Sequence, residues 1–153
     1  MSPLLASPAH AAGNDYPYAS DTTQSSDQWG FTKRQCVSFA AWELAQVGHR
    51  INNANNAWGN ASHWDETARA SGYRLSATPV LGAVAQWNAG ERSAYYPAGG
   101  GTGYLQAGTY GHVAMVIKVY ADTSVQVEQY NLSGNRSYST MHVKAPRYLY
   151  IGK

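Results

Sequence analysis

Apolar residues recur at three- and four-residue spacing in the first third of the chain, as they do on one face of an amphipathic helix. These positions are Val37, Ala40, Ala41, Leu44, Ala45 and Val47. They predict a helix over residues 33–47, with Gly48 as its C-terminal stop. Cys36 would then lie in the first turn of this helix. A second, shorter helix is predicted over residues 64–71.

The second half of the chain has the composition and alternation of β-strands. Residues 112–120 are rich in β-formers, and residues 124–130 alternate Val with polar side chains across a three-residue turn. These two segments predict an antiparallel hairpin in which Tyr120 lies opposite Ser124. Strands are also predicted within residues 79–88, 137–143 and 147–152. Helices followed by a run of strands indicate the α+β class.

Three stretches predict loops. Residues 1–30 are rich in Ser, Asp, Asn, Pro and Tyr, and residues 52–64 are rich in Asn. Residues 89–111 contain three consecutive glycines and predict a flexible surface loop.

Length and charge narrow the classes of protein. The 153 residues suffice for about one domain. The net charge of +2 is too small and too scattered to indicate a nucleic-acid partner. No apolar run approaches the roughly 20 residues that a membrane-spanning helix needs.

The N-terminus indicates export. Residues 4–12 read LLASPAHAA, which resembles the end of a signal peptide cleaved near Ala11 or Ala12. A linker would look similar. Residues 1–14 are therefore assigned to a signal-peptide remnant or linker and residues 15–153 to the domain, and the sequence leaves open whether this domain was excised from a larger modular protein.

The single cysteine is the first candidate for chemistry. One Cys excludes an intramolecular disulfide, and a lone thiol is unusual in an exported protein. Cys36 is therefore either buried and inert or retained for its reactivity. A helix N-terminus lowers the pKa of a thiol, and a catalytic Cys also needs a His and a group that orients this His.

His112 and Glu128 are the candidates for these two roles. His112 begins a strand, and Gly111 before it leaves room for close approach. The predicted hairpin register places residue 112 near 132, so Glu128 would be a diagonal neighbour on the same face. His63, in the Asn-rich loop, is the competing imidazole. Each feature alone is more often structural than catalytic.

Together these segments resemble the CHAP domain, a cysteine, histidine-dependent amidohydrolase/peptidase, in the style of actinobacterial wall enzymes. The resemblance covers roughly residues 15–150. It is carried, in order and spacing, by the strings RQCVSFAAWEL, WGNASHW, PVLGAVAQWN, GHVAMVIKVY and VQVEQYN.

The resemblance implies a papain-like α+β fold with N-terminal helices packed on an antiparallel sheet. It implies Cys36 as nucleophile, His112 as general base and Glu128 as the acid that orients His112. The backbone N–H of Cys36 would help to hold the oxyanion. Many members add an Asn two positions after the acid. This chain has Tyr130 there and Asn131 one position further on, so Asn131 is kept as a candidate fourth member.

The resemblance also bears on metals. Some phage members bind calcium through acidic residues nine and seven positions before the Cys and two after it. Asp27 matches the first position, but Trp29 and Ser38 occupy the others. We therefore expect no metal and no cofactor, and Asp15, Asp21 and Asp27 are interpreted as turn and capping residues.

The implied substrate is bacterial peptidoglycan, cut either at the muramoyl–L-alanine amide or within the stem peptide or cross-bridge. A substrate groove is predicted from aromatic residues: Trp58, Trp64, Tyr95, Tyr96 and Tyr104. Two alternatives remain: a catalytically silent wall-binding module, and an amidase or transacylase that acts on a small peptide conjugate.

Overall fold

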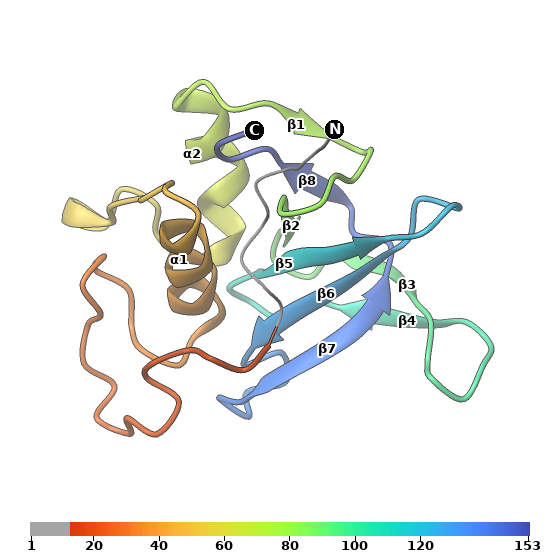
Figure 1. Ribbon diagram of the computed structural model, residues 1–153, viewed down its shortest axis with the longest axis horizontal. Coiled ribbons are helices and arrows are strands. Elements are labelled where there is room, and N and C mark those ends of the chain that lie inside the picture. Colours follow the sequence, from red (N-terminus) through yellow and green to blue (C-terminus); the bar gives the residue numbers. More distant parts are fainter. Residues whose placement is uncertain (1–12) are drawn as a thin grey trace, which may run out of the picture.

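The computed structural model describes residues 13–153, so the predicted signal-peptide remnant in residues 4–12 lies outside the described part. Eight antiparallel strands form one curled sheet in the order β1-β8-β2-β5-β6-β7-β3-β4. In Figure 1 the helices lie on one side of this sheet and the β3–β4 hairpin lies at its far end.

The strands are β1 (Leu75–Ser76), β2 (Val84–Trp87), β3 (Arg92–Tyr95), β4 (Gly103–Gln106), β5 (His112–Val119), β6 (Val125–Tyr130), β7 (Tyr138–Val143) and β8 (Arg147–Leu149). The helices are α1 (Cys36–Gln46) and α2 (Trp64–Ala70), with short 3₁₀ turns η1 (Ala54–Asn56) and η2 (Ala61–His63). The predicted α+β class is confirmed. No helix within residues 13–153 is long and apolar enough to cross a bilayer.

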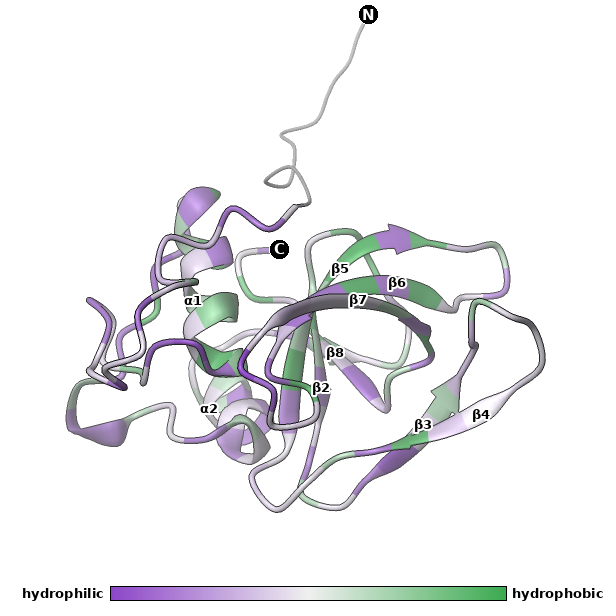
Figure 2. Ribbon diagram, turned by 90° about the horizontal axis from the view of Figure 1, so that it is seen from below, coloured by the Kyte–Doolittle hydropathy of each residue, from purple (hydrophilic) through white to green (hydrophobic). Residues whose placement is uncertain are grey.

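Helix α1 forms where the periodic apolar pattern predicted it, and its first residue is Cys36. Gly48 follows with a φ of 88°, a conformation that glycine adopts without strain and that ends the helix. Phe39, Ala40 and Leu44 are fully buried against the β5 face that carries Val113 and Met115. Figure 2 shows the apolar stretches of α1, β5 and β6 in green.

The opposite face of the curled sheet encloses a second apolar cluster. Its members include Ala114, Val116, Val127, Met141 and Val143. Successive residues of a strand point to opposite faces. The central strands β5 and β6 therefore contribute side chains to both clusters.

A β-bulge shifts the register of the β5–β6 hairpin. Near the turn the predicted pairing is confirmed, because the N–H of Tyr120 donates to the carbonyl of Ser124 at 2.9 Å. The register then shifts between Val116 and Lys118, so Met115 lies opposite Glu128. One extra residue in β5 exchanges the two faces of β6 relative to the prediction.

The glycine-rich segment 89–111 is more ordered than predicted. It contains the β3–β4 hairpin, in which Tyr95 pairs with Gly103. Tyr95 also pairs with Val143 and so joins the hairpin to β7. The prediction of a flexible loop over the whole segment was therefore wrong, because pairing across the sheet outweighed the local loop composition.

Candidate active site

Cys36 occupies the first position of α1, where backbone N–H groups have no partner within the helix. Its thiol is close to the N–H groups of Val113, Val37 and Cys36 itself, all of which favour the thiolate. Burial outweighs them and raises the pKa of the thiol to about 11. The resting thiol is therefore protonated at neutral pH, although the residue as a whole is partly exposed.

His112 is the first residue of β5 and is 4% exposed. Its ring packs against Trp87 with centroids 5.6 Å apart. Burial lowers the pKa of the imidazole to about 4, and the hydrogen bond to Gln129 opposes this shift only in part. At neutral pH the resting pair is a thiol and a neutral imidazole.

Gln129 fixes the orientation of His112. His112 Nε2 lies 2.9 Å from Gln129 Oε1. The amide nitrogen of Gln129 donates to Ser139 Oγ at 3.2 Å, which leaves the amide oxygen facing the ring. Since an amide oxygen only accepts, Nε2 carries the proton and Nδ1 is the basic nitrogen.

Glu128 does not contact His112, and the predicted geometry is corrected. Because of the bulge, Glu128 shares the face of Met115 and points toward α1. Its Oε1 accepts hydrogen bonds from Gly13 N and Tyr138 Oη, each at 3.0 Å. Gln129 takes the neighbouring place beside His112, and sequence reasoning missed it.

The position of Asn131 in the sequence could have indicated that Gln129 orients His112. The family pattern places an Asn two positions after the residue that orients the His, and Asn131 is two positions after Gln129. Asn131 Nδ2 donates to Gln35 Oε1 at 2.6 Å, directly before Cys36. Its backbone has a φ of 59°, which Asn tolerates better than most residues.

Glu128 instead forms a buried carboxyl pair with Glu43 of α1. The two residues are 1% and 3% exposed. Burial and the hydrogen-bonded Glu128 raise the pKa of Glu43 to about 10, and Asp15 adds to the shift. At neutral pH Glu43 is protonated, so that two buried like charges do not face one another.

This pair predicts a pH-dependent stability. An acid whose pKa is about 10 when folded and about 4.3 when unfolded loses stabilisation as pH rises between these values. Glu43→Gln cannot ionise, so we expect it to be the more stable protein at pH 9 by about 1–3 kcal/mol. Urea unfolding at pH 5, 7 and 9 measures this. The control is Glu66→Gln, which changes an exposed residue. If the unfolding free energies of wild type and Glu43→Gln changed equally with pH, the assignment would be contradicted.

Gly111 brings the start of β5 against two other segments. A Cβ on this residue would lie 2.5 Å from the carbonyl oxygen of Trp87 and 2.7 Å from the nitrogen of Ser62. The N–H of Ser62 donates to the carbonyl of Tyr110 at 2.9 Å. The expected close approach at Gly111 is confirmed.

Cys36 and His112 both line one cavity of about 600 Å³. Its walls come from the segment before α1 and the first turn of α1, the Asn-rich loop, Leu105 of β4 with the segment between β4 and β5, and the turn after β6. Asn131 and Gln35 lie at this cavity, as does Tyr110, whose side chain is 70% exposed. The fold thus unites four segments that are distant in the sequence.

The five aromatic residues predicted to form a substrate groove do not line this cavity. Trp58 and Trp64 are 6% and 0% exposed, and their rings pack on one another in the core. None of the five predicted aromatic residues is among the described residues that line the cavity. They are Trp58, Trp64, Tyr95, Tyr96 and Tyr104. The exposed His63 does not line it either.

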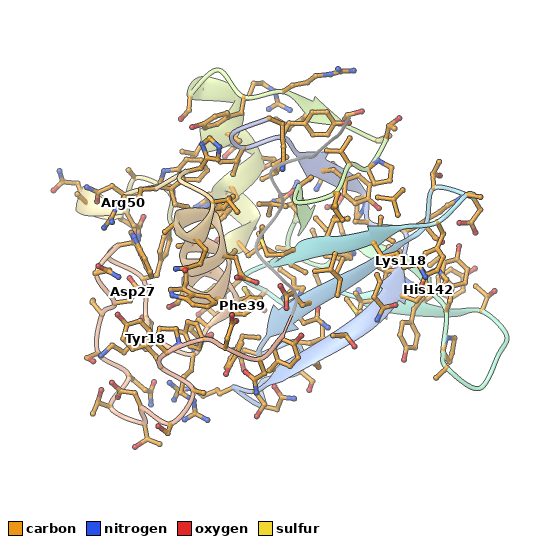
Figure 3. The ribbon with its side chains drawn as sticks, in the orientation of Figure 1. Tyr18, Asp27, Phe39, Arg50, Lys118 and His142 are labelled. Atoms are coloured by element: carbon orange, nitrogen blue, oxygen red, sulfur yellow. The ribbon has the colours of Figure 1, made fainter. Side chains whose placement is uncertain are left out.

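The tyrosines lie on or next to the β3–β4 hairpin, at the far end of the sheet. Tyr96 packs against His142 with ring centroids 4.7 Å apart, and Tyr104 packs under Arg92. Figure 3 shows His142 and Lys118 at this end, away from Phe39 of α1. The order of the strands places the outer end of this hairpin away from α1 (Figure 1), although Leu105 of β4 reaches the cavity.

Asp27 is a turn residue, as interpreted from the sequence. Its Oδ1 accepts from the N–H groups of Trp29 and Phe31, and its Oδ2 accepts from Ser38 Oγ at 2.6 Å. Asp21 likewise accepts from Thr23 and pairs with Lys33. The described residues contain no group of three or more His, Cys, Asp or Glu placed to hold a metal ion.

Comparison with protein-family models decides the family, because the model of the CHAP domain matches residues 26–131. The chain belongs to the CHAP domain family. The match spans α1 through Asn131 and so includes Cys36, His112 and Gln129.

Several curated relatives of this CHAP domain come from staphylococci. The N-acetylmuramoyl-L-alanine amidase sle1 of Staphylococcus epidermidis is 32% identical over 72% of the chain and 29% of its own length. The staphylococcal secretory antigen SsaA of Staphylococcus aureus is 33% identical over 66% of the chain and 30% of its own. The chain thus spans about a third of these relatives.

A solved structure agrees with the fold of this CHAP domain. The crystal structure of an N-acetylmuramoyl-L-alanine amidase from Staphylococcus aureus has a TM-score of 0.62 and 27% identity. The match covers 89% of this chain and 37% of that one. The expected α+β fold with helices against an antiparallel sheet is confirmed.

Proposed function

We propose that this CHAP domain is a cysteine hydrolase that cuts an amide bond of bacterial peptidoglycan. The observation that carries the proposal is that Cys36 and His112 line the same cavity, with His112 held by Gln129. The relatives support the substrate, since those named above include an N-acetylmuramoyl-L-alanine amidase. A secreted location fits the relative named as a secretory antigen.

The proposed mechanism is acyl transfer from a neutral pair. Nδ1 of His112 takes the thiol proton as Sγ of Cys36 attacks the amide carbonyl. The N–H of Cys36, at the positive end of α1, stabilises the oxyanion. Nε2–H of His112 stays bonded to Gln129, which stabilises the imidazolium that forms.

The second half of the reaction returns the enzyme to its resting state. His112 gives its proton to the leaving amine as the C–N bond breaks and a Cys36 thioester remains. Water then loses a proton to His112 and attacks the thioester, and the thiolate recovers that proton on departure. Asn131 and Gln35 are assigned to positioning at the start of α1, on the strength of their 2.6 Å hydrogen bond.

Gln129→Glu tests the assignment of the partner of His112. A neutral imidazole is the base, so activity is lost as pH falls through its pKa of about 4. A carboxylate beside the ring favours the charged form, so Gln129→Glu is expected to raise this pKa and move the acid limb up by about 1–3 pH units. The pH profile of kcat/KM and the NMR titration of His112 measure the shift.

Two further variants control this experiment. Gln129→Leu removes the hydrogen bond and is expected to lower kcat by roughly 10- to 100-fold with little change in KM. Glu128→Gln makes the reverse exchange, from carboxyl to amide, on the face of β6 that points to α1. An acid limb that moves with Glu128→Gln and not with Gln129→Glu would contradict the assignment.

The digestion of purified peptidoglycan tests the function as a whole. New N-terminal alanine with a free muramic carboxyl indicates an amidase, and any other new amine indicates an endopeptidase. A silent wall-binding module releases neither and leaves the turbidity of a wall suspension unchanged. An enzyme for small peptide conjugates cuts soluble substrates and leaves the wall intact.

A further inference from the structure

The described lining of the cavity at Cys36 combines apolar and uncharged polar side chains. Among the described residues that line it, none is Asp, Glu, Lys or Arg, and His112 is the one titratable nitrogen base. His112 is neutral, because its pKa is lowered to about 4. Of the other described lining residues, six have amide side chains, Asn56, Asn60 and Gln35 among them, and three have hydroxyls, Thr109 among them.

Such a lining discriminates against a charged group next to the scissile bond. A carboxylate that leaves water needs a cationic partner or several donors, and an unpaired one is costly. A carboxamide both donates and accepts, so Asn and Gln side chains can satisfy it. The cavity therefore fits a neutral amide better than the corresponding acid.

The positive end of α1 does not remove this discrimination. Its first N–H groups, those of Cys36 and Val37, lie at the thiol, where the oxyanion of the reaction develops. A resident carboxylate there would compete with the transition state. The net charge of +2 attracts anions at long range, so a preference for the neutral substrate has to arise within the cavity.

Building on the proposed function, we propose that the cavity selects amidated stem peptides, in which the free carboxyl beside the scissile bond is a carboxamide. In peptidoglycan this carboxyl belongs to the second stem residue, which is D-glutamate or its amide, D-isoglutamine. It lies within one residue of the muramoyl–L-alanine bond and next to the bond that follows it. The selection therefore applies to a cut at either of these two bonds and not to a cut in the cross-bridge.

The test compares two synthetic muramoyl tetrapeptides that differ only in D-isoglutamine against D-glutamate at this position. We expect kcat/KM to be at least about tenfold higher for the amide at pH 7. The ratio of kcat/KM for the amide substrate to that for the acid substrate should decrease as pH approaches about 4, where the carboxyl of the acid substrate becomes neutral. Because both substrates meet the same enzyme, the titration of His112 cancels in the ratio.

A charge-reversal variant strengthens the test. Thr109 is an exposed residue of the cavity wall, and Thr109→Lys supplies the missing cation. We expect it to raise kcat/KM for the acid substrate and narrow the ratio. Thr102→Lys, exposed between β3 and β4 and outside the lining, should leave the ratio unchanged.

The outcomes separate the two proposals. Equal rates on both substrates, or faster cleavage of the acid, would overturn the selectivity while the hydrolase function stands. Cleavage of neither soluble peptide nor purified wall would overturn both. An equal effect of Thr109→Lys and Thr102→Lys would assign the preference to the overall charge rather than the cavity.

Discussion

Cys36→Ala is expected to lower the rate of wall hydrolysis by at least about 10⁴-fold, since loss of a covalent nucleophile leaves only binding and oxyanion stabilisation. His112→Ala is expected to cause a loss of similar size, and the double variant should be no worse than either single one, because the two groups act as a unit. Release of new end groups from purified peptidoglycan measures the rates.

The matched control is Thr102→Ala, which changes an exposed residue between β3 and β4 and outside the cavity lining. It should keep most of the activity. Unchanged circular dichroism and melting temperature would show that Cys36→Ala is folded. A folded Cys36→Ala protein with wild-type lytic activity would contradict the assigned nucleophile and favour a different site.

Gly111→Ala is expected to destabilise the domain by about 2–4 kcal/mol. Its φ of 74° costs an L-residue about 1 kcal/mol, and the new Cβ would be forced against the backbone of Trp87 and Ser62. Backbone atoms cannot move aside as the end of a flexible side chain can. Urea unfolding of the two proteins measures the loss.

Gly108→Ala is the control from the same segment. A Cβ at Gly108 meets no atom within 4 Å, so this variant should change stability by less than about 0.5 kcal/mol. Because Gly111 directly precedes His112, Gly111→Ala should also lower kcat in the fraction that stays folded. Equal stability of Gly111→Ala and Gly108→Ala would contradict the close packing at this point.

The residue of β6 that contacts His112 could not be predicted from the sequence. Alternation along two strands predicted correctly that the partner of His112 would be a diagonal neighbour on β6. The bulge between Val116 and Lys118 inserts one residue and exchanges the faces, so Gln129 takes that place. Nothing in the local pattern of β5 marks the bulge, since Ile117 is as strand-prone as its neighbours.

The tyrosines predicted for the substrate groove lie away from Cys36 for a different reason. Tyr95, Tyr96 and Tyr104 are near His112 in the sequence, but β3 and β4 join the sheet beyond β7, on the side away from α1. A sheet order in which strand neighbours are distant in the chain depends on long-range pairing. The composition of a single loop contains no information about it.

The sequence by itself determined Cys36 at the start of a helix, because apolar periodicity and a terminal glycine are local signals. It also determined the β5–β6 hairpin and the close approach at Gly111. Only the tertiary structure decided which polar side chain of β6 holds His112, and that Glu128 pairs with Glu43. These outcomes depend on a one-residue shift and on burial, both of which are set by packing between distant segments.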